Sequence, residues 1–313
     1  MKRSEIMKCD LCSVEAVTFI DYNGSHLCAE HFVKYVNKRV KKEIRKQIKV
    51  QSGDLIAIAV SGGKDSMVML HILNEIFGNR PNVKLHVITV DEGIEGYRPP
   101  SVQIVRDYCS KHNILLSVRS FSELGLTMDS VFHITGDGSP CTYCGVFRRK
   151  LMNDEARKIN ARVIATGHNL DDMAQSILMN FVRGDVEHFV KLGPHEKVRS
   201  GMIPRFNPLR IIPEIESLLY AILVKIPFWD GECPYWTEAL RNQYRDIIDN
   251  LDSRTPGIKF SILSSYDEIR PMLYDKYPSV EINKCQCGEP CVKLKCKACE
   301  YVETIGKQIN KND

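Results

Sequence analysis

The chain has 313 residues, of which 43% are hydrophobic and 26% charged, and its formal net charge is +4. This composition is typical of a soluble globular protein, and no apolar run approaches the roughly 20 residues that a membrane span needs. The charged segment from Met1 to Lys8 lacks the apolar centre of a secretory signal, so we expect a cytoplasmic protein without a membrane partner. Single cores stop growing near roughly 250–300 residues, which predicts one main domain with smaller appendages.

Twelve cysteines require an explanation that holds in a reducing compartment. In the cytosol, clustered cysteines are metal ligands or catalytic thiols more often than disulfides. Eleven of the twelve fall into three groups, near the N-terminus, in the middle and near the C-terminus of the chain. The remaining one, Cys109, lies on an expected amphipathic helix, where a buried apolar role is the simplest interpretation.

The first element in chain order is a short unit with two chelating pairs, Cys9-x-x-Cys12 and Cys28-x-x-His31. An Asn-Gly turn between them predicts a β-hairpin. Three thiolates and one imidazole suit a tetrahedral structural Zn²⁺, which would stabilise a unit too small to fold on its core alone.

A basic segment follows this unit. Apolar residues recur every four positions from Phe32 to Ile48, which predicts an amphipathic helix. Eight basic residues and one acid, Glu43, lie between Lys34 and Lys49. A solvated helical face and a nucleic-acid contact explain this charge equally well when the segment is taken alone.

Strands and helices alternate through the middle of the chain. The expected strands are residues 55–60, 85–90, 114–118 and 162–166, and the expected helices are 67–77, 101–112 and 171–182. The alternation predicts an α/β fold with a doubly wound parallel sheet, which binds its ligands at the carboxyl ends of the strands. After Pro208 the pattern becomes helical, with candidate helices at 214–225 and 237–251.

A glycine-rich segment, Ser61-Gly62-Gly63-Lys64-Asp65-Ser66, lies between the first expected strand and the first expected helix. The glycines let backbone N–H groups approach an anion, the helix N-terminus adds a favourable dipole, and Lys64 supplies a positive charge. The segment therefore predicts a phosphate-binding loop. It matches neither G-x-x-x-x-G-K-[ST] nor G-x-G-x-x-G.

The run S-G-G-K-D-S after a strand resembles the PP-loop of the ATP pyrophosphatase superfamily, whose members cleave ATP between the α and β phosphates and transfer AMP to a carbonyl oxygen. The resemblance implies an adenine nucleotide alpha hydrolase-like fold with Lys64 and Asp65 as catalytic residues. It also implies an ATP site formed by Ala59, Ser61, Gly62, Gly63, Lys64, Asp65, Ser66, Val90, Gly167 and Asp172.

A second segment, A-T-G-H-N-L-D-D at residues 165–172, ends the fourth expected strand and begins a helix. Two adjacent carboxylates at a helix start can cap the helix or hold Mg²⁺. A G-H-N-x-D-D run in this place resembles the second signature of PP-loop RNA-modifying enzymes. By that resemblance Asp172 has a catalytic or metal-binding role, and Asp171 is the expected cap.

The middle cysteines differ from the other groups because they number only three. Cys141-x-x-Cys144 lies in a segment with glycine and proline that we expect to be a loop, and its distant companion is Cys233. An open metal position is typical of a reactive centre and not of a structural one. A redox pair, a persulfide relay and a cubane cluster with one open iron all fit these residues.

The last group offers five thiols for one site of four ligands. Cys296-x-x-Cys299 is a chelating pair, and we expect Cys285 and Cys287 to complete a second Zn²⁺ site, with Cys291 as the alternative ligand.

Taken together, these motifs resemble the group of TtuA and cytoplasmic 2-thiouridine synthetases, which is related to the TtcA cytidine thiolases. The resemblance implies a [4Fe–4S] cluster on Cys141, Cys144 and Cys233, whose unique iron carries the sulfur, and a catalytic basic residue at Arg148. It further implies Mg²⁺-ATP, a tRNA substrate, two Zn²⁺ ions and a homodimer. The sulfur donor would be sulfide, a persulfide or a ubiquitin-like sulfur carrier.

We therefore expect a tRNA sulfurtransferase that adenylates the C2 oxygen of a uridine and then replaces it with sulfur. The twelve Cys and ten Met are unlike high-temperature proteins, which favours wobble U34 over U54 of the T-loop. One alternative is a PP-loop enzyme that amidates or ligates a small carboxylate, but it needs no set of three metal units. The other is a zinc RNA-binding protein with a vestigial nucleotide loop, which would not need Lys64, Asp65 and Asp172.

The expected domains follow the motifs. They are an N-terminal zinc unit at 1–33, a basic linker helix at 34–50, the PP-loop catalytic domain at 51–230, a helical extension with the third cluster cysteine at 231–281, and a C-terminal zinc unit with a tail at 282–313.

Overall fold

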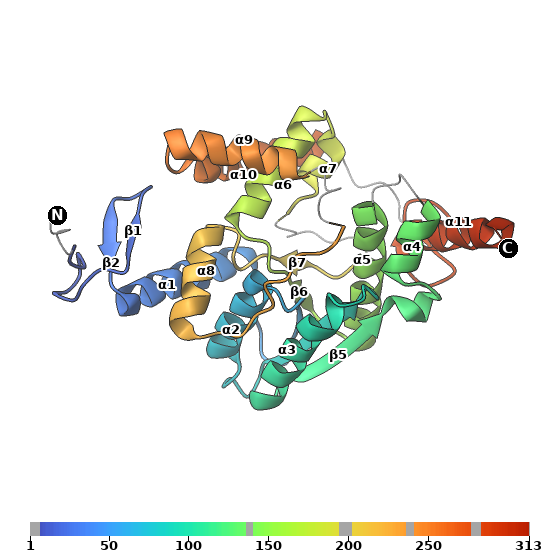
Figure 1. The fold of residues 1–313 in the computed structure, drawn as a ribbon, viewed down its shortest axis with the longest axis horizontal. Coiled ribbons are helices and arrows are strands. Elements are labelled where there is room, and N and C mark those ends of the chain that lie inside the picture. Colours follow the sequence, from blue (N-terminus) through green and yellow to red (C-terminus); the bar gives the residue numbers. More distant parts are fainter. Residues whose placement is uncertain (1–6, 136–139, 194–201, 236–240, 277–282, 313) are drawn as a thin grey trace.

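The computed structural model describes residues 7–135, 140–193, 202–235, 241–276 and 283–312. Its centre is a five-stranded parallel sheet in the order β5-β4-β3-β6-β7 (Figure 1). The strands are β3 (Leu55–Ala59), β4 (Lys84–Asp91), β5 (Leu115–Ser120), β6 (Val163–Ala165) and β7 (Arg205–Phe206). The predicted α/β fold with a parallel sheet is confirmed. The edge strand β7 was not predicted, because two residues carry no periodic signal.

Helices cover both faces of this sheet. They are α2 (Lys64–Phe77), α3 (Arg98–Lys111), α4 (Met128–Thr135), α5 (Pro140–Lys158), α6 (Leu170–Val182), α7 (Val186–Val190) and α8 (Glu214–Val224), with a 3₁₀ turn η1 at Phe121–Leu124. Ile56 and Ile58 of β3 pack into the core with α2 and α8, whereas Ala57 faces Ala156 of α5. This alternation is the period of two that a strand buried on both faces requires.

The N-terminal unit is the hairpin β1 (Thr18–Ile20) and β2 (Ser25–Leu27), which leads into α1 (Ala29–Gln47). The helix begins within the first predicted domain and buries Phe32, Val36, Val40 and Ile44 against the catalytic domain. Cys109 is also buried, as predicted, and burial raises the pKa of its thiol to about 11.

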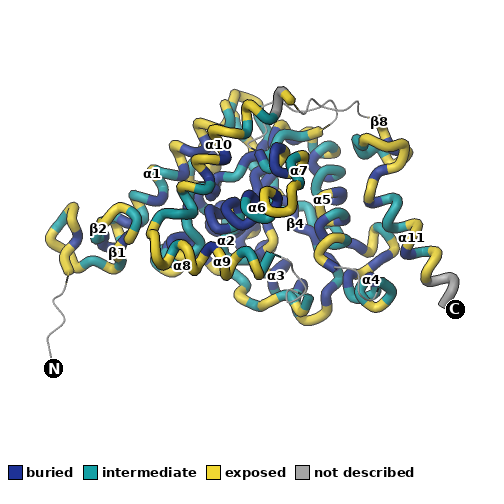
Figure 2. The backbone as a smooth tube through the Cα atoms, turned by 90° about the horizontal axis from the view of Figure 1, so that it is seen from above, coloured by how far each residue is buried: buried dark blue, intermediate teal, exposed yellow. Residues whose placement is uncertain are grey.

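The C-terminal part consists of α9 (Arg241–Arg254), α10 (Ile258–Lys276), the short hairpin β8 (Asn283–Lys284) and β9 (Pro290–Cys291), and α11 (Lys297–Asn312). The start of the predicted helix 237–251 lies outside the described residues. Hairpin β1–β2 and α11 lie at opposite ends of the molecule, and the buried residues concentrate between them (Figures 1 and 2). No helix among the described residues is both long and apolar enough to cross a membrane.

The prediction of a loop at Cys141 and Cys144 was wrong. Both cysteines lie in the first turns of α5, which begins at Pro140. Pro140 is the first described residue of this helix, which continues through both cysteines to Lys158. The glycine at 145 lies within this helix, and a Cβ there would lie 3.2 Å from Nη1 of Arg149.

Candidate functional site: a phosphate loop beside three cysteines

The phosphate loop is closed by its own hydrogen bonds at the carboxyl end of β3. Ser66 Oγ accepts a bond from the Ser61 N–H at 3.2 Å and donates one to the Gly63 carbonyl oxygen at 2.8 Å. Gly62 has φ +87°, and a Cβ there would lie 2.4 Å from the Ser101 carbonyl oxygen. Only glycine allows this conformation and this close approach. The loop is therefore preformed for an anion at the N-terminus of α2.

The phosphate loop at residues 61–66 and the segment at residues 165–172 lie against each other. A Cβ on Gly167 would lie 3.0 Å from the Cα of Ser66, so the segment after β6 lies directly on the phosphate loop. Ala59 ends β3 beside this loop, and Val90 lies near the end of the neighbouring strand β4 with its side chain in the core. The predicted ATP residues are thus brought to one edge of the sheet.

Lys64 is paired with two carboxylates at the start of α2. Its Nζ lies 3.3 Å from Asp65 Oδ2 and 3.2 Å from Glu214 Oε1. Burial raises the pKa of the Asp65 carboxyl, and the nearby charges of Asp172 and Glu214 add to this effect against the opposing charge of Lys64. Glu214 was not predicted as a site residue, because it is 150 positions from Lys64 and no local motif marks it. A phosphate in the loop would compete with these carboxylates for the lysine.

The cap of α6 differs from the prediction. Asn169 Oδ1 accepts the Asp172 N–H at 2.9 Å, and Asp172 Oδ2 accepts the Asn169 N–H at 3.2 Å. This capping box makes Asp172 the capping partner, since the partner lies three residues after the N-cap. The expectation that Asp171 caps this helix was wrong. Asp171 instead accepts the backbone N–H of Glu214 at 2.7 Å and so fixes the start of α8.

Arg241 joins the helical extension to the second signature. Its Nη1 lies 3.2 Å from Asp172 Oδ1, and its Nη2 donates to Ser176 Oγ at 3.0 Å. The arginine is the first described residue of α9 and was not predicted, because its partners lie more than 60 positions away. It places a cation at the edge of the nucleotide site.

Two of the three middle cysteines pack against the apolar cluster that contains Val90 of β4. Cys144 and Cys233 are partly buried in the same apolar cluster, and Cys141 is exposed. Burial raises the pKa of the Cys144 thiol to about 11, and the nearby groups Glu92, Cys233 and Cys141 act in the same direction. Among the described residues, only the two terminal sets bring four ligand atoms within 4.8 Å of one another. Cys233 and Cys141 both act on the pKa of Cys144, and Cys141 acts on that of Cys233, so the three thiols are neighbours. Thiolates are the ligands that iron–sulfur clusters take.

A buried ion-pair network connects these cysteines to the phosphate loop. Arg98 donates to the Ser61 carbonyl oxygen at 2.8 Å and forms an ion pair with Glu92. The other oxygen of Glu92, Oε1, lies 3.7 Å from Nη1 of Arg148, one helical turn beyond Cys144. Arg98 and Glu92 are 2% and 4% exposed. Neither was predicted, since a single Glu or Arg after a strand gives no signal of its own.

Two terminal sets of side chains have the geometry of structural metal sites. Cys9, Cys12, Cys28 and His31 form one set, and Cys285, Cys287, Cys296 and Cys299 form the other. Backbone hydrogen bonds from Cys296 and Cys287 lower the pKa of the Cys285 thiol to about 6, which favours a thiolate. Cys291 lies outside the second set, and its Sγ contacts the Lys293 carbonyl oxygen at 2.9 Å.

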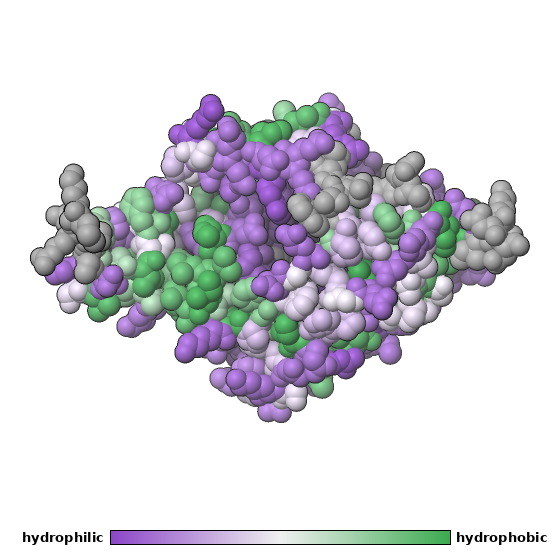
Figure 3. Space-filling model, viewed as in Figure 1, coloured by the Kyte–Doolittle hydropathy of each residue, from purple (hydrophilic) through white to green (hydrophobic). Residues whose placement is uncertain are grey.

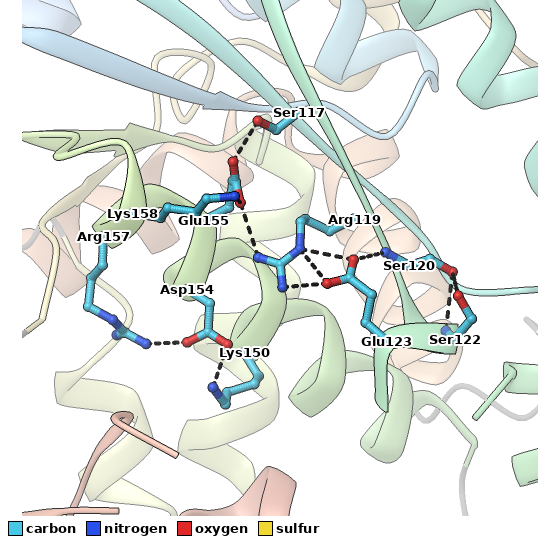
Figure 4. Close-up of polar contacts among 10 residues, drawn as sticks. All are labelled: Ser117, Arg119, Ser120, Ser122, Glu123, Lys150, Asp154, Glu155, Arg157 and Lys158. Carbon is cyan, nitrogen blue, oxygen red and sulfur yellow. Dashed lines mark hydrogen bonds and ion pairs between the residues drawn. The ribbon is translucent and has the colours of Figure 1, made fainter. Parts of the chain in front are cut away.

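Helix α5 is held at its C-terminal half by two polar clusters (Figure 4). Arg119 of β5 bridges Glu123 and Glu155, and Asp154 pairs with Lys150 and Arg157. Arg157 also pairs with Glu289 of the C-terminal unit. The second metal unit is therefore attached to the helix that carries Cys141 and Cys144.

The parallel sheet with a phosphate loop of this form defines an ATP-binding PP-loop protein. Residues 36–248 match the PP-loop domain family, and residues 8–33 match the family described as 2-thiouridine synthetase TtuA, N-terminal LIM domain. The chain belongs to the PP-loop family of tRNA 2-thiolation proteins. The predicted family is confirmed.

Relatives and a solved structure support this assignment over nearly the full chain. The tRNA 2-thiolation protein NcsA of Haloferax volcanii is 37% identical, with 96% of this chain and 99% of that protein covered. A probable sulfurtransferase of Methanocaldococcus jannaschii is 39% identical, with 95% and 88% covered. The solved U34-tRNA thiolase NcsA of Methanococcus maripaludis, with its [4Fe–4S] cluster, superimposes with a TM-score of 0.83 at 34% identity, covering 96% of this chain and 97% of that one.

Proposed function

We propose that the protein is an ATP-dependent tRNA uridine 2-sulfurtransferase that acts at wobble position 34. The observation that carries this proposal is the buried network in which Arg98 and Glu92 connect the phosphate loop to Arg148, beside Cys144. An adenylation site and a sulfur site that act on one uridine atom must be adjacent. The choice of position 34 over 54 is supported by the description of the solved relative as a U34-tRNA thiolase.

The first half of the reaction is adenylation of the uridine. The C2 oxygen attacks the α phosphate of ATP, pyrophosphate leaves, and the oxygen becomes part of AMP, a good leaving group. Lys64 and the N-terminus of α2 stabilise the negative charge that develops on the phosphates. Mg²⁺ enters with the nucleotide, whose phosphates would lie near the carboxylates of Asp65 and Asp172.

The second half is sulfur transfer. Cys141, Cys144 and Cys233 would hold a [4Fe–4S] cluster. When bound, such a cluster supplies an iron position that no cysteine occupies, at which sulfur can be held. Arg148 has a side chain that is 48% exposed and presents its cation beside these thiols.

A tRNA contact is supported by the charge of α1. Lys38, Lys41, Lys42 and Arg45 have no ion-pair partner within the part of the chain that the structure describes. Phosphate contacts from this helix, the two zinc units and Arg148 and Arg149 would orient the tRNA. The uridine must leave its stack to reach the site.

Three further parts of the proposal concern partners and location. The donor is sulfide, a persulfide or a ubiquitin-like sulfur carrier, and the protein acts in the cytoplasm. A homodimer is supported by an apolar surface over the N-terminal hairpin and α8 (Figure 3), where Phe19, Ile215 and Ile222 are 51%, 70% and 58% exposed. Contiguous apolar surface of this kind marks interaction sites.

The decisive experiment is mass spectrometry of tRNA from a strain without this gene. We expect 2-thiouridine to disappear from position 34 and to return when the wild-type gene is restored. A Cys233→Ala gene should not restore it. Unchanged 2-thiouridine at position 34 in the deletion strain would overturn the proposal.

A further inference from the structure

His168 lies between the two halves of the site and has no role in the chemistry described above. It is the third residue after β6, is accessible to solvent, and its Nδ1 lies 3.1 Å from Thr166 Oγ1. The charged groups that face it come from three helices: Asp172 of α6, Arg241 of α9 and Arg148 of α5. The first two lie at the nucleotide edge and the third beside the cysteines. The imidazole is therefore close to both proposed half-reactions.

The hydrogen bonds of Thr166 favour one tautomer of this histidine. The single hydroxyl proton of Thr166 is donated to Asn207 Oδ1, so Thr166 Oγ1 can only accept from His168. With Asn207 Oδ1 as the acceptor of the Thr166 proton, Nδ1 carries the imidazole proton and Nε2 carries the lone pair. Asn207 is itself held by Gln47, which accepts its backbone N–H at 2.9 Å and donates to its carbonyl oxygen at 3.0 Å. A chain of hydrogen bonds thus connects this imidazole to Gln47, the last residue of α1.

The surroundings also favour the neutral imidazole. Desolvation by the surrounding protein lowers the pKa of His168 below its ordinary value of 6.5. The positive charges of Arg241 and Arg148 act in the same direction, and the charge of Asp172 and a side-chain hydrogen bond with Asn207 oppose them. A neutral histidine whose Nε2 carries the lone pair is prepared to accept a proton.

We infer that His168 is a catalytic residue that carries the N3 proton of the uridine between the two half-reactions. This inference rests on the proposed function, which supplies the uridine. Other groups at this edge are already engaged: Asp172 in the capping box and with Arg241, and Lys64 with its two carboxylates.

The proton balance of the reaction requires such a group. In adenylation the O2–phosphorus bond forms, the bond from phosphorus to pyrophosphate breaks, and N3 loses its proton to Nε2 as a C2=N3 double bond forms. In thiolation hydrosulfide forms the C2–S bond and AMP leaves with the electron pair of the C2–O2 bond. The imidazolium then returns its proton to N3, the proton of the hydrosulfide goes to solvent, and C2=S remains. Nothing is oxidised or reduced.

The test uses the adenylation half alone, in cluster-free full-length protein with Mg²⁺-ATP and a tRNA that carries unmodified U34. Pyrophosphate release is measured in single turnover between pH 5 and pH 8.5, and ATP affinity is measured separately. For the wild type we expect the rate to rise with pH to a plateau, with an apparent pKa below 6.5. In His168→Asn, whose amide can still donate to Thr166, we expect the plateau to fall on the order of 10²–10⁴-fold and the acid limb to disappear, with ATP affinity unchanged.

The matched control is His188→Asn. His188 is an exposed histidine on α7 that pairs with Asp185, and its replacement should leave rate and pH profile unchanged. As a second variant, His168→Gly should regain activity when imidazole is added, because a free base can enter the vacated space. This rescue decides the question if His168→Asn is poorly folded.

A wild-type rate and pH profile in His168→Asn would overturn the inference. So would a loss of ATP affinity that accounts for the whole effect, or a failure of imidazole to rescue His168→Gly. The proposed function fails separately, if the wild-type protein releases no pyrophosphate with this tRNA.

Discussion

Arg98 donates a hydrogen bond from Nη1 to the carbonyl oxygen of Ser61 at 2.8 Å, so the start of α3 is attached to the phosphate loop. The same guanidinium bonds to Ser101 Oγ at 2.9 Å and to the carbonyl oxygen of Val90. Its positive charge is balanced by the buried carboxylate of Glu92. The geometry of the loop therefore depends on an ion pair that the protein has removed from water.

We predict that Glu92→Gln destabilises the fold by about 3–5 kcal/mol, because it leaves the buried cation of Arg98 without a counter-charge. Urea denaturation of the ATP-free protein measures this change. The matched control is Glu95→Gln, at an exposed position three residues away, which should change the free energy of unfolding by less than about 0.5 kcal/mol. Equal stability of the two variants would contradict the assigned role of the pair.

Replacement of Gly62 by alanine is expected to abolish ATP binding. A Cβ at this position would lie 2.4 Å from the backbone oxygen of Ser101, so the loop must move and its N–H groups no longer converge. Gly53→Ala is the control, since Gly53 has φ +90° but no atom within 4 Å of the added Cβ. That variant should lose about 1–2 kcal/mol of stability from backbone strain alone and keep its ATP affinity, measured by calorimetry. Similar ATP affinities in the two variants would show that the clash at Gly62 is harmless.

The sheet and the phosphate loop could be predicted from the sequence, but helix α5 could not. The runs that became β3 and β4 are apolar and end in a glycine-rich loop or a polar turn, so the sheet and the loop have local signals. Helix α5 was missed because Pro140 and the glycine at 145 suggest a loop when their neighbours in space are unknown. Both residues lie within the helix, and a Cβ on the glycine would lie 3.2 Å from Nη1 of Arg149, a contact that depends on the fold.

The residues that complete the site have no local signal at all. Glu214 reaches Lys64 from 150 positions away, and Arg241 reaches Asp172 from 69. Each is one charged residue near the start of a helix, where such residues are common on any protein surface. Their roles follow from the packing of α8 and α9 against the edge of the sheet, which periodicity does not describe.

The C-terminal set of four cysteines leads to a prediction about metal content. Cys296→Ala removes one of four converging ligands, and we expect the Zn²⁺ content to fall from two ions to one per chain. Cys291→Ala should retain both ions, because that sulfur lies outside the set. Elemental analysis of cluster-free protein measures both. A loss of zinc in Cys291→Ala would instead make Cys291 a ligand.

The same variant should also weaken the link between the C-terminal unit and α5. Glu289 pairs with Arg157 and accepts from Asn153 Nδ2 at 2.8 Å, and it lies between the cysteines of the metal set. We expect limited proteolysis of Cys296→Ala to cut within 283–312 while the PP-loop domain stays intact. Cleavage at the same rate as in Cys291→Ala would show that the metal does not hold this unit in place.

The raised pKa of Asp65 gives a pH dependence with a definite sign. Burial lets the folded protein keep the Asp65 proton at pH values where the unfolded chain has lost it. The free energy of unfolding therefore falls as the pH rises from the ordinary pKa of 3.8 through the raised value. Asparagine cannot ionise, so Asp65→Asn lacks this part of the decline and should be more stable than the wild type at neutral pH. We also expect its adenylation to be slower.

Denaturation of ATP-free protein at several pH values from 4 to 8 measures the difference. The control is Asp107→Asn, whose exposed carboxylate accepts a bond from Gln103 at 2.7 Å and should not change the shape of the curve. A curve for Asp65→Asn that runs parallel to that of the wild type would mean that ionisation of Asp65 does not lower the stability of the ATP-free protein. The expected result, a more stable but slower variant, would show that the site holds Asp65 ionised at the expense of stability because the nucleotide requires its charge.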